Sequence, residues 1–358
     1  MTTLLVLALQ LDQARIDDAI RKGVAFLKTA ESPGHNQIAH ADELLLYTFV
    51  VAGVPATDER FQKLLQRVLT DEPTHVYRVT LQAMALEELD RVRYQERIAQ
   101  CAQFLVDNQC PNGQWSYGEP TKLDKDDSVA SGGAPKEVGN RKVARRIVVR
   151  QRRTGPPEGD NSNSQYAALG LRACHDAGIV IPDSVIQRAD RWWESTILGD
   201  KKLGNAIASG GDTPRGWGYK KGEEPYNAMT AGGVGCLVIY DYLKRADWKK
   251  NQKSRDGLAW MAGSYWLSGP PAGVTPYWYY YYLYGVERVG MLYGTPVIGT
   301  KDWYFDGAKW LLDQQGPNGA WDQNKLYANP SNPSYDTCFA ILFLKKATRG
   351  LTASQDRR

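Results

Sequence analysis

Polar side chains gather at the predicted starts of several helices, where they could recognise or orient a ligand. Asp160 opens the segment Asp-Asn-Ser-Asn-Ser-Gln, and Asp336 lies in the first turn of the last predicted helix. Free N–H groups and the helix dipole at an N-terminus favour anions and polar ligands. They also keep a carboxylate charged, which suits orienting a cation or polar substrate better than donating a proton. We therefore assign catalytic roles to Asp160 and Asp336, with helix capping as the alternative role of each.

The same helix starts supply candidate substrate-binding residues with amide, hydroxyl, imidazole, guanidinium or aromatic groups. The aromatic run 277–282 places rings on every side of one helix, so part of it must face inward. Such rings could contact an isoprenoid, a carbocation or a sugar face. The candidates are His40, Glu43, His75, Tyr77, Arg78, Asn161, Asn163, Gln165, Tyr226, Asn227, Thr230, Trp278, Tyr279 and Tyr280.

Apolar spacing at i, i+3 and i+4, with Pro and Gly as breakers, predicts the helices that position these residues. Outer helices are predicted at 15–29, 57–70, 92–109, 182–197, 252–266 and 302–315. Inner helices are predicted at 38–52, 74–89, 161–177, 226–244, 277–292 and 333–347, because these segments are more apolar and richer in small residues that permit close packing. The apolar stretch 147–149 is too short and too closely flanked by Arg to indicate a strand. The expected fold is therefore all-α.

An internal repeat supports a ring of helical hairpins. Segments 102–115 and 308–321 nearly superimpose, and both end a helix in Gln-x-x-x-Gly-x-Trp (a QW motif), while 215–219 is a weaker copy without the Gln. Pro and Gly end the helix, because Pro cannot continue one and Gly accepts positive φ. We predict that the Gln amide bonds loose backbone groups at the helix end. Trp115 and Trp321 then cover the junction with the next helix.

These motifs, with segments 160–169, 229–233 and 336–342, resemble the prenyltransferase and squalene-cyclase repeat superfamily. The likeness covers most of residues 15–348, and the pattern most resembles single-toroid bacterial proteins with prenyltransferase or squalene-oxidase repeats. It implies an α/α toroid (α6/α6 barrel) of about six hairpins that holds an apolar or isoprenoid small molecule in its central cavity. Any catalysis would be prenyltransferase- or terpene-cyclase-like. Toroids host several functions, so the likeness is specific for fold and weak for chemistry.

A zinc site is incomplete in this sequence. Asp336-Thr-Cys338 is similar to the Asp-x-Cys zinc ligands of protein prenyltransferase β subunits. No His follows His175, so a third protein ligand would have to come from elsewhere in the ring. We expect no metal and no other cofactor, with zinc disfavoured.

An acid motif is present in an unsuitable setting. Asp124-Lys-Asp126-Asp127 spells the Asp-x-Asp-Asp motif with which class II terpene cyclases protonate an alkene. That step requires an apolar pocket that tunes the pKa of the acid, whereas these residues lie in a polar, Lys-containing insertion. Those cyclases also resemble two fused barrels, and this chain has the length of one. A solvated charge run is therefore expected here.

Two other classes of function stay open. The α6/α6 barrel also serves inverting glycosidases, whose two carboxylates stand about 6.5–9.5 Å apart, and Asp42, Glu43, Asp160 and Asp336 could supply such a pair. A non-catalytic scaffold would explain the incomplete motifs. A deep aromatic tunnel would favour an isoprenoid, an open groove with facing carboxylates a carbohydrate, and a filled centre a scaffold.

The chain as a whole is expected to form one toroid over 15–348, with a basic loop insertion at 116–159 and a tail at 349–358. Residues 1–14 are either a clipped signal peptide or a first helical turn, which leaves export and the bacterial cytoplasm both open. The apolar run 4–9 is too short for a membrane span, and a net charge of +4 demands no nucleic-acid partner. The basic stretch 136–153 either covers an anionic ligand or acidic partner, or is a solvated loop.

Overall fold

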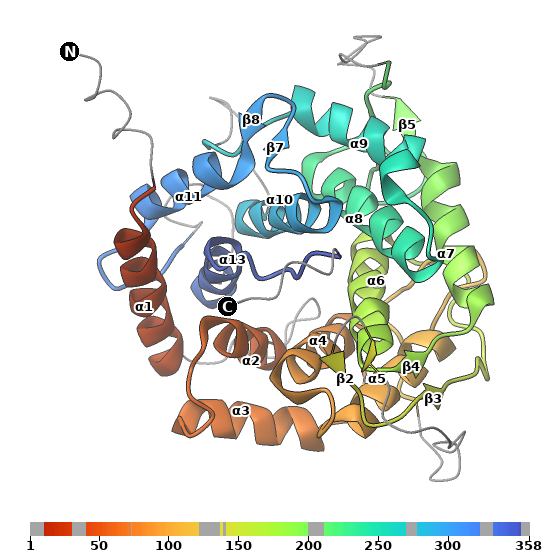
Figure 1. Cartoon of the computed structure of the whole chain (residues 1–358), viewed down its shortest axis with the longest axis horizontal. Coiled ribbons are helices and arrows are strands. Elements are labelled where there is room, and N and C mark those ends of the chain that lie inside the picture. Colours follow the sequence, from red (N-terminus) through yellow and green to blue (C-terminus); the bar gives the residue numbers. More distant parts are fainter. Residues whose placement is uncertain are drawn as a thin grey trace.

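The computed structural model describes residues 11–30, 41–72, 74–121, 137–138, 141–199, 211–269, 278–322 and 332–351. Within them the helices form two concentric rings, seen down the shortest axis of the molecule in Figure 1. The inner ring consists of α2 (Ala41–Ala52), α4 (Val76–Asp90), α6 (Asn161–Asp176), α8 (Asn227–Leu243), α10 (Tyr279–Tyr293) and α13 (Pro333–Leu344). The outer ring consists of α1 (Gln13–Thr29), α3 (Glu59–Thr70), α5 (Gln95–Asp107), α7 (Asp183–Thr196), α9 (Gln252–Gly263) and α11 (Trp303–Gln314).

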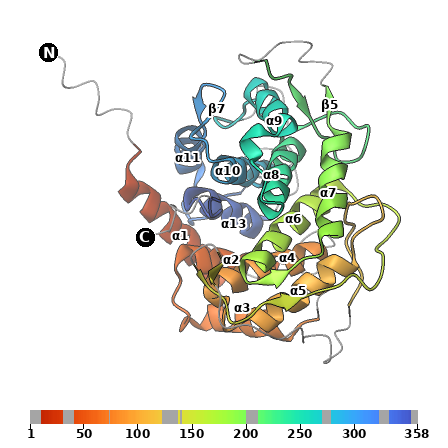
Figure 2. The ribbon, with the colours of Figure 1, turned by 45° about the vertical axis from the view of Figure 1, so that its right-hand side comes forward.

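The inner ring is closed. Each inner helix packs on the next in chain order, and α13 packs back on α2. The outer helices lie against them, for example α5 against α4 and α6, and α7 against α8 (Figure 2). Sequence periodicity predicted the all-α fold and the inner or outer position of all these helices, and the family resemblance implied the toroid.

Side-chain chemistry explains the two rings. Outer helices carry one apolar face and begin at caps such as Asp12, Asp58 and Asp302, whose carboxylates accept backbone N–H groups. Helices α6, α8 and α13 are buried on nearly all sides. Small residues let them approach closely: a Cβ on Gly232 of α8 would lie 2.7 Å from the Gln165 Oε1 atom of α6.

Three buried tryptophans each join one outer helix, α5, α7 or α11, to the inner helix that follows it. The backbone N–H groups of Trp115, Trp217 and Trp321 donate to hydroxyls of the following inner helices, which belong to Ser164, Thr230 and Thr337 (3.0–3.2 Å). Their indole N–H groups donate to backbone carbonyls at the end of the preceding outer helix (2.7–2.9 Å). The three copies of the sequence repeat therefore have one structural role.

The glutamines of the repeat reach the next outer helix. Gln109 Nε2 donates to the carbonyl of Val185 in α7 at 2.8 Å, and Gln315 Nε2 donates to that of Ala19 in α1, also at 2.8 Å. The copy that lacks Gln uses an ion pair instead, in which Arg215 Nε lies 2.9 Å from Asp256 Oδ2 in α9.

Short strands connect the helices at the periphery, and one of them corrects the sequence analysis. β3 (Ile147–Val148) pairs in parallel with β4 (Ile179–Val180), although 147–149 had been judged too short for a strand. Ile147 and Val149 are buried and Val148 is exposed, so alternation over three residues is enough where the partner strand is fixed by the end of α6. The other pairs are β1 (Glu137–Val138) with β2 (Arg141–Lys142), β5 (Leu198–Gly199) with β6 (Arg215–Gly216), and β7 (Val297–Ile298) with β8 (Lys301–Asp302).

The described part of the basic insertion runs along α5. Gln95 and Gln103 of that helix donate side-chain hydrogen bonds to the carbonyls of Arg145 and Arg150, and Asp107 accepts the N–H of Arg152 at 2.8 Å. All five cysteines are buried and free. Among the described helices, none is long and apolar enough to cross a membrane.

Candidate functional site

Helices that are not neighbours in the inner ring meet through aromatic side chains at the barrel centre. Tyr281 and Tyr284 lie on one face of α10. The Tyr281 ring is parallel to that of Tyr166 from α6, with centroids 6.1 Å apart, and lies 5.7 Å from Phe339 of α13. The Tyr284 ring stacks on the ring of Phe339, with centroids 5.9 Å apart. Because α8 separates α6 from α10 in the ring, these contacts cross the centre of the barrel.

A chain of polar groups joins the same helices. Tyr77 OH donates to Ser162 Oγ at 2.6 Å, Ser162 Oγ lies 3.1 Å from Tyr281 OH, and Gln165 Nε2 donates to that phenol oxygen at 2.6 Å. Tyr77, Ser162 and Tyr281 stand in the first turns of α4, α6 and α10, so the N-termini of these helices lie at one mouth of the barrel.

A guanidinium lies within this group. Arg288 of α10 is 3 % exposed, and its Nη2 donates to Gln165 Oε1 at 2.8 Å. Its Cζ lies 5.5, 5.8 and 4.6 Å from the ring centroids of Tyr166, Tyr281 and Tyr284, which is cation–π distance. Nη1 is buried without a hydrogen bond, and within the described ranges no carboxylate forms an ion pair with this residue. We call Arg288 and the side chains around it, Tyr77, Ser162, Gln165, Tyr166, Tyr281, Tyr284 and Phe339, the tyrosine cluster.

The tyrosine cluster is suited to binding and poorly suited to proton donation. Burial raises the pKa values of Tyr77, Tyr281 and Tyr284 well above the ordinary value of 10, so their phenols stay neutral. Arg288 is a permanent cation. Neutral hydroxyls, ring faces and one positive charge can hold an apolar chain with a polar or anionic group.

The predicted residues at the start of α6 are mostly used by the fold. Asp160 caps the helix, with Oδ1 accepting the Asn163 backbone N–H at 2.7 Å and Oδ2 its side-chain amide at 2.8 Å. Burial raises the pKa of Asp160, although the hydrogen bonds from Asn163 act in the opposite direction and lower it. Asn161 bonds Gln114, Trp192 and the carbonyl of Gly218, which joins three segments. Gln165 is the predicted residue of this set that belongs to the tyrosine cluster.

A second buried carboxyl lies where α2 meets α4. Glu43 accepts a hydrogen bond from Arg78 Nε at 2.8 Å, and Arg78 also pairs with Asp71 at 2.8 Å. Glu43 Oε2 is buried without a hydrogen bond. Loss of water raises the pKa of Glu43 to about 7, although Arg78 pulls it down. His75 precedes α4 beside Thr74, and burial together with Arg78 lowers its pKa.

Some of the predicted residues on α8 and α10 lie at the exposed mouth of the barrel, and the others are buried between helices. Tyr226 and Trp278 stand at the helix starts and are 42 % and 38 % exposed. Thr230 holds the backbone of Trp217, and Asn227 Nδ2 is buried without a hydrogen bond.

Tyr279 and Tyr280, which the sequence analysis predicted to bind substrate, lie against the outer ring. Both rings pack on Trp310 of the outer helix α11, with centroids 4.8 and 5.7 Å apart. Their direction follows from the helix period, because consecutive residues point about 100° apart. Among the described residues of the aromatic run, 278–282, Tyr281 is the one that contacts Tyr166 and Phe339 at the centre.

Asp336 and Cys338 are both buried in the first half of α13. Of the histidines in the described residues, His75 stands at the start of α4 and His175 in the last turn of α6. Among the described residues, no three His, Cys, Asp or Glu side chains come together in a way that could hold a metal ion. His40 and the motif at 124–127 lie outside the described residues.

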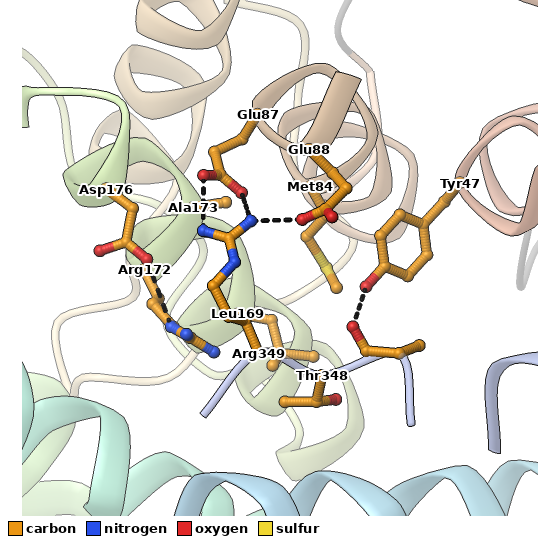
Figure 3. A pocket seen from close by; sticks show the side chains of 11 residues that line it. Tyr47, Met84, Glu87, Glu88, Leu169, Arg172, Ala173, Asp176, Thr348 and Arg349 are labelled. Atoms are coloured by element: carbon orange, nitrogen blue, oxygen red, sulfur yellow. Dashed lines mark hydrogen bonds and ion pairs between the residues drawn. The ribbon is translucent and has the colours of Figure 1, made fainter. Parts of the chain in front are cut away.

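The opposite end of the barrel carries a network of ion pairs (Figure 3). Arg349 bonds both carboxylate oxygens of Glu87 at 3.0 and 3.1 Å and also bonds Glu88. Thr348 donates its N–H and hydroxyl to Glu287 at 2.8 and 2.7 Å. These contacts hold the segment after α13 against α4 and α10. Together with α2, α4 and α6, residues 347–349 also line a cavity of about 40 Å³. Water or a very small group fits that space.

Comparison with known proteins supports the fold. No protein-family model matches the sequence, and no curated protein does. The structure of the type II terpene cyclase MstE from Scytonema matches with a TM-score of 0.50 and 13 % identity, over 93 % of this chain and 99 % of that one. A variant of MstE in complex with its substrate, geranylgeranyl dihydroxybenzoate, matches with a TM-score of 0.52 and 13 % identity, over 93 % and 97 %. The chain therefore has a toroid fold like that of terpene cyclases and prenyltransferases.

The comparison also corrects one premise of the sequence analysis. Class II cyclases were expected to need two fused barrels, yet this single toroid matches nearly the whole MstE chain. Chain length therefore gives no argument against a cyclase.

Proposed function

We propose that this protein binds an isoprenoid in the centre of its toroid, at the tyrosine cluster. The observation that carries the proposal is that aromatic rings from α6, α10 and α13 meet across the barrel around a chain of neutral hydroxyls. Apolar chains gain from contact with ring faces, and a few fixed polar groups orient them. The complex of MstE with a geranylgeranyl substrate supports this choice of ligand at the level of the fold.

Direct binding tests the proposal. Purified protein is titrated with geranylgeraniol, squalene and geranylgeranyl diphosphate, with oligosaccharides as controls, and binding is followed by tyrosine and tryptophan fluorescence and by thermal shift. We expect saturable binding of at least one isoprenoid and none of the sugars. Binding of an oligosaccharide alone would favour the carbohydrate-active alternative, and binding of nothing would favour a scaffold.

A pair of tyrosine variants on α10 locates the site. Tyr281→Ala removes a ring from the centre, whereas Tyr293→Ala removes the half-buried ring at the other end of the same helix that Lys249 covers. We expect Tyr281→Ala to weaken isoprenoid binding at least about tenfold, because burying a large apolar side chain is worth roughly 1.5–3 kcal/mol. Tyr293→Ala should bind like the wild type. Equal effects of the two variants would move the site away from the tyrosine cluster.

The two aspartates keep a proposed role at the same mouth. Asp160→Asn and Asp336→Asn are compared with a triple Asp→Asn change at 124, 126 and 127, with circular dichroism as the check on folding. We propose that the helix-start aspartates affect ligand binding or turnover more than the loop does. A loss confined to the loop variant would contradict this and reopen the cyclase interpretation of that motif.

A further inference from the structure

In the part of the chain that the structure describes, Arg288 has no carboxylate partner at the centre of the barrel. Its neighbours in the tyrosine cluster are phenols, one amide and aromatic rings, all of them neutral. Glu287, the next residue in the chain, does not pair with Arg288. Its carboxylate accepts hydrogen bonds from the amide and hydroxyl of Thr348 at the far end of the barrel. Burial of an ion costs several kcal/mol unless it is paired, and ring faces offset only part of that cost.

Packing alone does not explain why this buried position carries a charged residue. A packing role would be filled as well by Met or Leu, which carry no desolvation cost. The hydrogen bond from Nη2 to Gln165 and the interaction with the Tyr166 phenol orient the guanidinium, while Nη1 is buried without a hydrogen bond to the protein. A buried donor that is held in place and has no acceptor among the described protein groups is the arrangement expected where a ligand supplies the acceptor.

We propose that Arg288 binds the carboxylate head group of an isoprenoid acid whose chain lies against the tyrosine cluster. This inference rests on the proposed function and names the chemical class of its ligand. A guanidinium matches a carboxylate in shape and pairs with it through two parallel N–H groups. The charge also matches, since one guanidinium balances one carboxylate, whereas a diphosphate brings a larger negative charge into the same dry site.

Ligands that share one tail test the head group. Geranylgeranoic acid, its methyl ester, geranylgeraniol and geranylgeranyl diphosphate are titrated into wild type, Arg288→Met and Arg145→Met. The Met substitution at 288 keeps side-chain volume and removes the charge. Arg145 is the matched control, because its guanidinium pairs with Glu96 on the outer ring.

We expect wild type and Arg145→Met to prefer the acid over the alcohol and the ester by at least about tenfold, the size of a hydrogen-bonded charge pair. Arg288→Met should lose that preference and keep its affinity for the alcohol. If Arg288→Met does not fold, Arg288→Lys takes its place and should weaken the preference for the acid, because an ammonium cannot offer two parallel N–H groups to a carboxylate.

Three results would overturn the inference: equal affinity of wild type for acid and alcohol, a preference for the acid that survives Arg288→Met, or tighter binding of the diphosphate. Each of these leaves isoprenoid binding intact, so it refutes the head group and spares the proposed function. Failure of wild type to bind any of the four ligands refutes both.

Discussion

Gln315, at the end of the last outer helix, donates a hydrogen bond of 2.8 Å from Nε2 to the backbone carbonyl of Ala19 in the first. The two residues are 296 positions apart in the chain. Trp321 follows six residues later and packs on α1, where a Cβ on Gly23 would lie 2.8 Å from its ring. The same motif that joins neighbouring hairpins elsewhere thus closes the outer ring between α11 and α1.

Trp321→Ala should lower the free energy of unfolding by about 3–5 kcal/mol, because it removes a fully buried indole and leaves a cavity. Urea denaturation measures the change. Trp278→Ala, which truncates an exposed tryptophan, is the control and should change stability by less than about 0.5 kcal/mol. Unchanged stability of Trp321→Ala with lost ligand binding would show that this residue belongs to the site and not to the ring closure.

Gln315→Ala should loosen α1 selectively. The substitution removes the part-buried hydrogen bond to Ala19, worth about 1 kcal/mol, and also the bond from Nε2 to the carbonyl of Gly319 at 2.8 Å. The first of these joins the first and last outer helices. Hydrogen exchange should therefore speed up in residues 13–29. Gln109→Ala is the matched comparison and should speed up exchange in α7, where Val185 accepts the equivalent bond. Faster exchange spread evenly over the chain in both variants would count against local closure.

Glu43 should make stability depend on pH near neutrality. Its pKa is raised from 4.5 to about 7 in the folded protein, so the folded state binds the proton more tightly than the unfolded state. This contribution to stability is complete below about pH 4.5 and is lost as the pH rises through about 7. Glu43→Gln cannot titrate, so the stability of wild type relative to the variant should fall by up to about 3 kcal/mol between pH 5 and 8. Parallel pH profiles would show that Glu43 is ionised throughout.

The purified protein should carry no stoichiometric zinc. Asp336 and Cys338 stand near the start of α13, whereas His175 is in the last turn of α6, at the other end of the inner ring, and His75 lies beside Thr74. Elemental analysis after purification without chelators decides the matter. About one equivalent of zinc that disappears in Cys338→Ser would restore the protein-prenyltransferase interpretation.

Arg349→Met should destabilise the protein by about 2–4 kcal/mol, since Glu87 and Glu88 lose a shared and largely buried partner. Arg91 still pairs with Glu87, which keeps the loss below that of an isolated buried pair. Lys22→Met, which breaks an exposed pair with Asp18, should cost less than about 1 kcal/mol. A similar small effect in both variants would mean that the segment after α13 contributes little to stability.

The sequence predicted the helices well because each ring has its own pattern: one apolar face outside, and apolar or small residues on all sides inside. The strand at 147–148 was missed because its partner, 179–180, becomes adjacent only in the folded chain. The aromatic run 277–282 indicated that some ring must face the centre, but not which one. Which tyrosine faces the centre depends on how α10 is rotated about its axis, and a short run of aromatic residues does not define that rotation.

Arg288 was also missed, although a signal was present. It is a basic residue within an apolar inner helix, seven positions after Tyr281 and four after Tyr284, and this spacing puts the three on one face. The helix-start argument drew attention to N-caps instead. Asp160 and Asn161 turned out to satisfy backbone and side-chain groups of the fold, which local sequence could not distinguish from ligand contacts.

The closure of the inner ring between α13 and α2 sets an order of assembly during synthesis. Helix α2 leaves the ribosome early, yet one of its flanks gains its partner only when α13 has been made. Until then, two apolar inner helices present uncovered sides to the cytosol or to the translocation machinery, and such surfaces attract chaperones. The ring closes through contacts between α13 and α2, which are far apart in the sequence. Contacts of such high sequence separation slow the final step of folding. Hairpins nearer the middle of the chain complete their packing first, and the nascent protein stays an open arc until the seam between α13 and α2 forms.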